Sequence, residues 1–229
     1  MSDPNSDIAA EIAERRAAIL QRMGAAAQTA RRSASDIALV AISKVQPDDR
    51  VEAMLGAGQR VFGENRVQEA QARWTERRER YPGLELRLVG PLQSNKAGDA
   101  VALFDVIETL DRDSLAKALR KEIDKQGVTP RLYIQINTGE EDQKSGIPPQ
   151  ETADFVERMR SEYGFEIEGL MCIPPVGEPA GPHFALLADL AEACGVEKLS
   201  MGMSGDFETA IRFGATSVRV GTALFGERG

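Results

Sequence analysis

One lysine in the sequence follows directly on an almost wholly apolar run. Lys44 comes after Ala38–Ser43, which has the composition of a buried parallel strand. At the end of such a strand an amine can sit in a partly dry pocket, where desolvation favours the neutral form that attacks an aldehyde. The alternative is a lysine whose amine reaches out to solvent. Spacing alone leaves both interpretations open.

Two glycine-containing segments near the C-terminus have the residues of an anion site. Gly202 permits close approach of the backbone to a ligand, and Ser204 offers a hydroxyl beside the start of a predicted helix. Gly221 and Thr222 supply the same combination at the next predicted helix. Because N–H groups at helix starts attract anions, the two segments together predict a phosphate site.

Two further polar side chains adjoin predicted strands. Asn65 follows an apolar run and can either present its amide to the same pocket or cap the next helix. Arg219 alternates with Gly221 on one strand face, so its guanidinium should point inward and needs an acceptor. That acceptor is either a ligand or the partner in a structural ion pair.

The elements expected to position these residues alternate between strands and helices. Eight short apolar runs are the predicted strands: residues 37–43, 60–63, 84–89, 105–109, 132–137, 166–173, 198–203 and 217–221. Each unit spans about 24 residues, close to what a strand, a three-turn helix and two short loops need. Eight such units predict an α/β fold, a (β/α)8 TIM-type barrel, whose reactive groups lie at the carboxyl ends of the strands.

The whole chain, residues 1–229, is expected to form a single barrel domain. Residues 1–35 contribute an extra N-terminal helix, with Ser6 or Asp7 placed to cap its start. Residues 36–229 contribute the eight βα units.

Composition and charge exclude several classes of function. The chain has 36 acidic and 28 basic residues, a net charge of −8, which argues against nucleic acid as a partner. The densest basic stretch, residues 73–80, is interrupted by Glu76 and Glu79 as on a solvated helix face. Membrane-length apolar runs, signal-peptide features and a disulfide framework are all missing from the sequence. We therefore expect a cytoplasmic protein without a membrane partner and, since no extended apolar patch is evident, a monomer.

A strand-end lysine, a phosphate site and an inward arginine describe a pocket for a phosphorylated aldehyde. Pyridoxal 5′-phosphate (PLP) meets these three demands. The sole histidine, His183, has no nucleophile motif to pair with, so we interpret it as a structural or surface residue and not as a catalytic one.

Eight segments carry a resemblance to a known family, and they occur in the family's order. They are residues 40–47, 62–69, 89–96, 134–137, 144–147, 168–174, 199–206 and 218–226. On these residues the chain resembles the pyridoxal phosphate homeostasis proteins, whose fold is similar to the N-terminal barrel of alanine racemase. The resemblance implies that Lys44 carries a covalent aldimine with PLP, that Asn65 lines the pocket and that Arg219 faces the pyridine nitrogen. It also implies that the phosphate is bound by Ser204, Gly221 and Thr222.

One departure from the family pattern is visible in the third predicted strand. Leu86 and Arg87 stand where the family commonly has an aromatic residue and a histidine. The role of that histidine cannot be carried over to this chain, and we expect the change to leave the cofactor site untouched.

The resemblance and the side-chain chemistry together favour a carrier over a catalyst. An arginine only donates hydrogen bonds, so a pyridine nitrogen facing Arg219 stays unprotonated and is a poor electron sink. Racemisation also needs an acid or base opposite the lysine, whereas Tyr81, Tyr133 and Tyr163 are best interpreted as packing residues. We expect a protein of intracellular vitamin B6 homeostasis that binds, holds and releases PLP with little or no turnover.

Two alternatives remain for the same residues. One is a PLP-dependent racemase-like enzyme acting on small amino acids, with Lys44 as its sole base. The other is a barrel that senses a phosphorylated metabolite without covalent bonding. For the carrier, transient contact with PLP-dependent apoenzymes is the expected protein interaction.

Overall fold

The structure, a computed structural model, describes residues 4–226. Eight parallel strands form a closed barrel in sequence order, and β1 pairs with β8 to close it. The strands are β1 (Ala38–Ile42), β2 (Val61–Glu64), β3 (Glu85–Leu88), β4 (Val106–Leu110), β5 (Arg131–Ile136), β6 (Ile167–Cys172), β7 (Lys198–Ser200) and β8 (Ser217–Val220). The predicted α/β barrel is confirmed, and each strand overlaps its predicted run.

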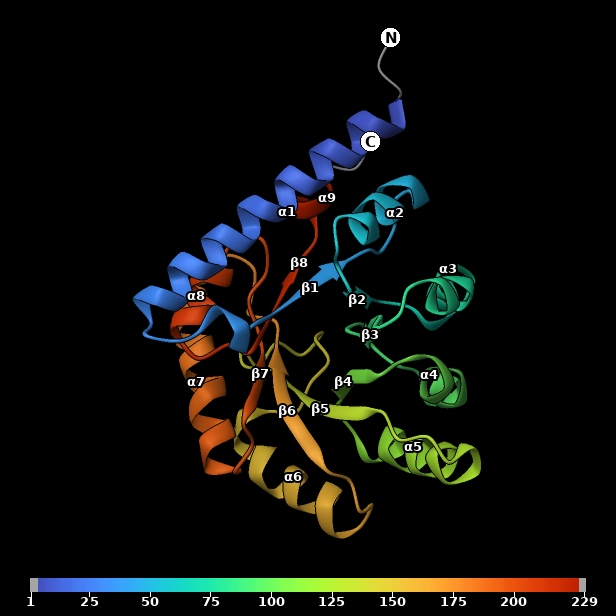
Figure 1. Cartoon of the computed structure of the whole chain (residues 1–229). Coiled ribbons are helices and arrows are strands. Elements are labelled where there is room, and N and C mark those ends of the chain that lie inside the picture. Colours follow the sequence, from blue (N-terminus) through green and yellow to red (C-terminus); the bar gives the residue numbers. More distant parts are fainter. Residues whose placement is uncertain (1–3, 227–229) are drawn as a thin grey trace.

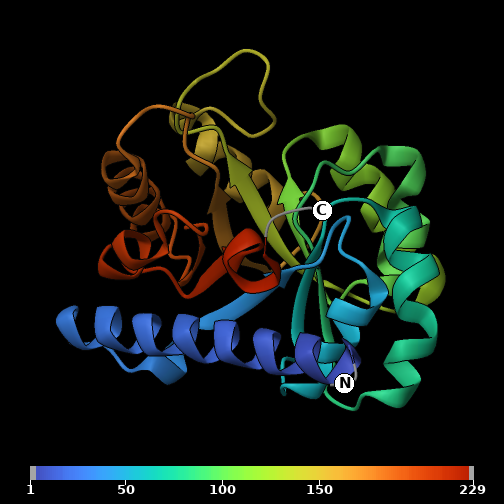
Figure 2. The ribbon, with the colours of Figure 1, turned by 90° about the horizontal axis from the view of Figure 1, so that it is seen from above.

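Helices surround this sheet on its outer side (Figure 1). They are α1 (Pro4–Thr29), α2 (Asp48–Gly56), α3 (Val67–Arg80), α4 (Ala97–Leu103), α5 (Asp113–Gln126), α6 (Thr152–Ser161), α7 (Ala180–Ala193), α8 (Phe207–Arg212) and α9 (Thr222–Phe225). Short 3-10 turns η1 (Ala34–Asp36), η2 (Ser94–Lys96) and η3 (Pro149–Glu151) complete the chain. The segment between β5 and η3 extends away from the rest of the ribbon (Figure 2).

The extra N-terminal helix lies along the outside of the barrel. Its contacts are with α2, α8 and α9, and Figures 1 and 2 show it crossing the side where the first and last strands meet. The predicted cap is wrong, because α1 begins at Pro4 and places Ser6 and Asp7 within the helix. Proline is favoured in the first turn of a helix, and Asp7 still lies where a carboxylate interacts well with the helix dipole.

The strands are buried because helices cover their outer faces, while their inner faces line the packed interior of the barrel. All five residues of β4 are buried, as parallel strands require. The seventh strand ends at Ser200 rather than at residue 203 as predicted. Gly202 has a φ of +91°, which takes the backbone out of the extended region, and a Cβ there would lie 2.5 Å from that of Ala210.

The basic stretch at residues 73–80 is only partly the solvated face predicted for it. Trp74 is fully buried and Arg77 is 8% exposed, and these two residues lie three apart on one helix face. Arg73 is 18% exposed in its side chain and also reaches into the protein. The expectation was therefore wrong for Arg73 and Arg77, because the buried tryptophan turns this part of α3 toward β2.

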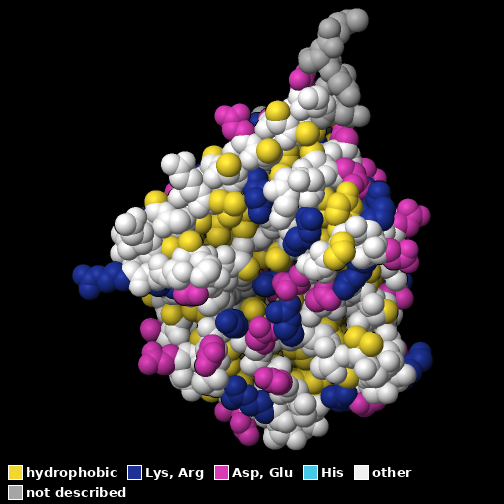
Figure 3. Space-filling view, viewed as in Figure 1, with side chains coloured by type: hydrophobic (Ala, Val, Ile, Leu, Met, Phe, Trp, Pro, Cys, Tyr) yellow, Lys and Arg dark blue, Asp and Glu magenta, His cyan; other side chains and the backbone are white. Residues whose placement is uncertain are grey.

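One face of the molecule shows intermingled charges. Lys and Arg side chains alternate with Asp and Glu across the face seen in Figure 3. Among the helices of residues 4–226, none combines the length and the apolar character that a membrane span requires.

Candidate functional site

All six predicted site residues border one cavity at the carboxyl ends of the strands. The cavity has a volume of about 250 Å³. Its polar lining consists of Lys44, Asn65, Ser204, Arg219, Gly221 and Thr222, and its apolar walls are Ile42, Val89, Ile173 and Met203. Barrel closure makes this possible, because the register that places Ala41 beside Val220 brings the ends of β1 and β8 together.

Lys44 lies directly beyond β1 with its side chain half-buried. It borders the cavity together with Gly221 and Arg219 of the far end of the chain. This placement favours the pocket interpretation over an amine that extends into solvent.

The two glycine-containing segments meet, as an anion site requires. The Gly221 N–H donates to Ser204 Oγ at 3.4 Å, which joins the β7–α8 connection to the end of β8. Gly221 is the N-cap residue of α9. Hydroxyls of Ser204 and Thr222 and the N–H groups at the start of a helical turn form a donor set that suits a phosphate.

Arg219 points into the barrel, as its alternation with Gly221 predicts. It is 4% exposed and donates to Ser200 Oγ at 2.6 Å and to the Cys172 carbonyl at 2.7 Å. Ser200 in turn donates to Glu108 Oε2 at 2.6 Å, which lies 4.0 Å from the guanidinium. The two alternatives for Arg219 therefore combine, since it borders the cavity and also belongs to a buried charge network.

Glu108 is a functional candidate that the sequence analysis missed. It is fully buried in the middle of β4, and its Oε1 accepts from Arg87 at 3.1 Å. Burial alone would lower the pKa of Arg87, but the carboxylates of Glu108 and Glu85 outweigh it and hold that pKa above its ordinary value. A glutamate within an apolar strand is the sequence signal that could have indicated this network.

The departure at Leu86 and Arg87 is thus connected to the site. Arg87 does not border the cavity, yet Glu108 and Ser200 link it to Arg219 through hydrogen bonds. The expectation that this change leaves the cofactor site untouched stays a prediction, with this hydrogen-bond chain as the route by which Arg87 could influence Arg219.

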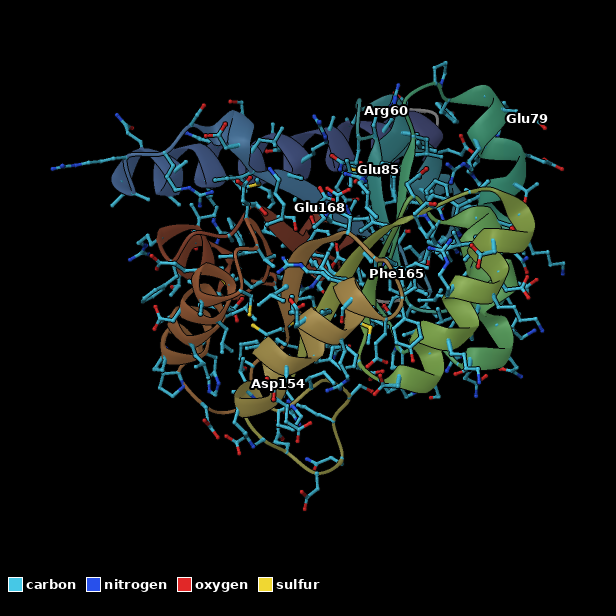
Figure 4. All side chains as sticks on the ribbon, turned by 90° about the horizontal axis from the view of Figure 1, so that it is seen from below. Arg60, Glu79, Glu85, Asp154, Phe165 and Glu168 are labelled. Atoms are coloured by element: carbon cyan, nitrogen blue, oxygen red, sulfur yellow. The ribbon has the colours of Figure 1, made fainter. Side chains whose placement is uncertain are left out.

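The same network continues to the opposite end of the barrel. Arg131 pairs with Glu85 at 2.5 Å and with Glu168 at 3.6 Å, and both glutamates are labelled in Figure 4. Glu85 also accepts from Arg87 Nε at 2.6 Å. Burial raises the pKa of Glu85, but Arg87 and Arg131 outweigh it and lower that pKa below its usual value. A continuous chain of charges therefore runs from the start of β5 to the cavity.

Asn65 does not cap the helix that follows it. The N-cap of α3 is Arg66, without a side-chain capping bond, so the helix-cap alternative is wrong. Gly90 packs against the Asn65 backbone, where an added Cβ would lie 2.3 Å from the Asn65 carbonyl oxygen. Asn65 also borders a second hollow of about 580 Å³ that includes Gln93 and Lys96.

The two cysteines are expected to differ in reactivity. Burial raises the pKa of the Cys172 thiol to about 12, and its side chain is inaccessible, whereas Cys194 is partly exposed. Because the thiolate is the reactive form, iodoacetamide at pH 8 should label Cys194 alone in the folded protein and both after denaturation. Peptide mass mapping measures this, and native labelling of Cys172 at the rate of Cys194 would contradict the burial of β6.

The histidine has a structural role. His183 Nδ1 lies 3.2 Å from the Thr138 carbonyl and its Nε2 lies 3.1 Å from Glu178. It therefore ties α7 to the connections that follow β5 and β6, and it is not among the residues that border the cavity.

Comparisons with known proteins match this chain over most of its length. The family model of the alanine racemase N-terminal domain matches residues 18–229. A pyridoxal phosphate homeostasis protein of Pseudomonas aeruginosa is 39% identical, with 95% of this chain and 96% of that protein covered. The corresponding protein of Vibrio cholerae is 38% identical, with 92% and 93% covered.

Solved structures agree with these sequence matches. PipY of Synechococcus elongatus, solved without PLP, superposes with a TM-score of 0.82 at 36% identity, covering 94% of this chain and 100% of PipY. PipY with PLP bound gives a TM-score of 0.78. An alanine racemase of Clostridium difficile gives 0.67 at 14% identity over 91% of this chain and 56% of its own, which is a likeness of fold alone. On the family model, the relatives and the shared barrel, this chain belongs to the family of pyridoxal phosphate homeostasis proteins.

Proposed function

We propose that this chain binds PLP in the 250 Å³ cavity as a Schiff base on Lys44, and that it holds and releases the cofactor with little or no turnover. The observation that carries this proposal is the convergence of an amine, an anion-binding donor set and an inward arginine on one cavity. The PLP bound in the related PipY supports it. The biological role would be intracellular vitamin B6 homeostasis.

The residues of the cavity fit the chemistry of this cofactor. Lys44 is the one amine that borders the cavity among the described residues. Its condensation with an aldehyde forms one C=N bond and releases one water, so no oxidant or other reactant is needed. Ser204, Gly221 and Thr222 would hold the phosphate while Arg219 donates to the pyridine nitrogen.

The composition of the lining supports holding over turnover. Within residues 4–226, Lys44 and Arg219 are the titratable side chains that border the cavity, and an arginine does not exchange protons at neutral pH. The tyrosines lie elsewhere: the Tyr81 hydroxyl donates to Glu52, and Tyr133 is 2% exposed with its pKa raised by burial. A racemase needs a second acid or base that this lining does not supply.

Further parts of the proposal follow from the sequence. We propose a single domain over residues 1–229, a monomer in the cytoplasm, and transient contact with PLP-dependent apoenzymes as the route by which the cofactor leaves. The net charge of −8 argues against nucleic acid as a partner, because like charges repel each other.

Borohydride reduction tests the covalent site. Reduction converts the C=N bond into a stable C–N bond, so peptide mass mapping of the loaded protein should place a pyridoxyl adduct on Lys44. An adduct on another lysine would move the covalent site. Retained PLP without any adduct would instead support a barrel that binds phosphorylated ligands without covalent bonding.

Incubation with alanine separates a carrier from an enzyme. The loaded protein should leave the optical rotation of D- or L-alanine unchanged over hours. Racemisation at about 1 s⁻¹ or faster, an ordinary enzyme rate, would overturn the carrier assignment.

Exchange of Arg219 for glutamine should weaken PLP retention. The charge-assisted contact with the pyridine nitrogen would be lost, which corresponds to about 1–3 kcal/mol. Glu108 keeps its contact with Arg87, so the interior retains a paired carboxylate. Equilibrium dialysis measures the effect, and unchanged retention would show that Arg219 does not face the ring.

A further inference from the structure

A tight turn carries Lys44 from β1 toward the cavity. The Gln46 N–H donates to the Ser43 carbonyl at 3.1 Å, so Lys44 and Val45 are the two central residues of the turn. Val45 has a φ of +54°, a left-handed conformation that β-branched residues rarely adopt and that glycine would adopt easily. A turn under such strain persists only where its surroundings hold it in place.

One arginine holds both ends of this turn. Arg73 of α3 donates from Nη1 to the Ser43 carbonyl at 2.5 Å and from Nη2 to the Gln46 carbonyl at 2.7 Å. The planar guanidinium fixes the separation between the two carbonyls, which a single-point donor such as lysine cannot do. The residues between those carbonyls are Lys44 and the strained Val45.

A buried carboxylate anchors the arginine. Glu64 at the end of β2 is 1% exposed, and its Oε1 accepts from Ser43 Oγ at 2.7 Å and Trp74 Nε1 at 3.0 Å. Arg73 Nη1 lies 3.3 Å from the same oxygen. Because a buried carboxylate needs a compensating charge, Glu64 and Arg73 stabilise each other and tie the turn to both β2 and α3. Figure 1 shows α3 lying outside β2.

We propose that Arg73 is a positioning residue that keeps the Lys44 amine directed into the cavity. Arg73 does not border the cavity, so it acts through the turn and not on the ligand. The inference rests on the proposed function, because it concerns condensation at Lys44. It predicts that loss of Arg73 impairs covalent capture while leaving recognition of the ring and phosphate intact.

Two ligands that differ in one group test this role. PLP can condense with Lys44, whereas pyridoxine 5′-phosphate has an alcohol in place of the aldehyde and binds only through the other contacts. For Arg73→Met, equilibrium dialysis should show PLP affinity falling roughly tenfold, as for the loss of one or two hydrogen bonds. Affinity for pyridoxine 5′-phosphate should change by less than about twofold, because its contacts lie on other strands.

Arg77→Met is the matched control. Arg77 is also buried on α3, where its Nε pairs with Glu52 at 2.7 Å and its Nη1 donates to the Arg73 backbone carbonyl at 2.6 Å. It shares the exposed Asp48 with Arg73, but among the described residues it makes no hydrogen bond to residues 43–46. This variant should leave the ratio of the two affinities unchanged even where it lowers the melting temperature. Arg73→Lys keeps a positive charge beside Glu64 and replaces Arg73→Met in the experiment if that variant does not fold. It should likewise lose affinity for PLP and keep its affinity for pyridoxine 5′-phosphate.

An equal loss for both ligands, or no loss for PLP, would overturn the positioning role of Arg73. Failure of the proposed function looks different, because the wild-type protein itself would then give no borohydride adduct on Lys44. With a wild-type adduct present, an unchanged ratio in the Arg73 variants rejects the positioning role alone.

Discussion

Replacing Lys44 with alanine is expected to abolish the visible absorption band of the aldimine. The variant would lack the one amine that borders the cavity among the described residues. PLP affinity should fall about 100-fold, which corresponds to about 2.8 kcal/mol, while the phosphate contacts remain. The melting temperature of the unloaded protein should change little, because Lys44 is half-buried and the anion-binding donors belong to other strands.

Lys96→Ala is the control for this experiment. Lys96 borders the neighbouring hollow and lies 3.6 Å from Asp99, so its loss should leave the band and the affinity unchanged. An undiminished band in Lys44→Ala would mean that another lysine forms the covalent bond. Loss of the band in both variants would point to a general effect of charge at the barrel mouth.

Replacing Glu108 with alanine should cause the largest loss of stability. Its two oxygens accept from Arg87 and Ser200, and Ser200 accepts from Arg219. Removal of Glu108 therefore leaves Arg87 with Glu85 as its remaining carboxylate, and leaves the buried Arg219 without one. Breaking a buried pair in this way costs about 3–5 kcal/mol. Urea denaturation of the unloaded protein measures the free energy of unfolding.

Glu168→Ala provides the comparison at the far end of the same network. Its side chain is 26% exposed and lies 3.6 Å from Arg131, so its removal should cost less than about 1 kcal/mol. A Glu108→Ala protein within about 1 kcal/mol of wild type would show that the two arginines find other acceptors or water. The same variant should also bind PLP more weakly, because Arg219 loses the carboxylate behind Ser200.

The fold was predictable because buried parallel strands have a recognisable sequence pattern. Each strand of a covered barrel is a short apolar run, and the runs around Ile42, Ile107 and Ile134 stand out without any structural knowledge. The convergence of the site followed from the same architecture. A barrel brings the carboxyl ends of its strands to one rim, so Lys44 and Thr222 were expected to meet despite their separation in sequence.

The buried ion pairs and hydrogen bonds were harder to predict, because the sequence around a charged residue does not show which residue it contacts in the fold. Glu108 and Arg87 lie on adjacent strands, and nothing local in either strand specifies the other. Arg73 had the appearance of a surface residue because glutamates surround it in sequence, whereas its acceptors, the carbonyls of Ser43 and Gln46, belong to a segment about one βα unit earlier. Such contacts become visible only when the helices are placed on the barrel.

Closure of the barrel between β1 and β8 has a consequence for biogenesis. The amine contributed by Lys44 and the donors contributed by Gly221 and Thr222 become neighbours only after Val40 has docked against Arg219. On the proposed function, the complete binding site would therefore form only after the eighth strand has been synthesised and inserted. The fraction of protein with ligand bound would then measure the fraction in which the barrel has closed. Excess vitamer should stabilise variants whose terminal strands dock poorly, because a ligand that binds only the closed barrel shifts the equilibrium toward it.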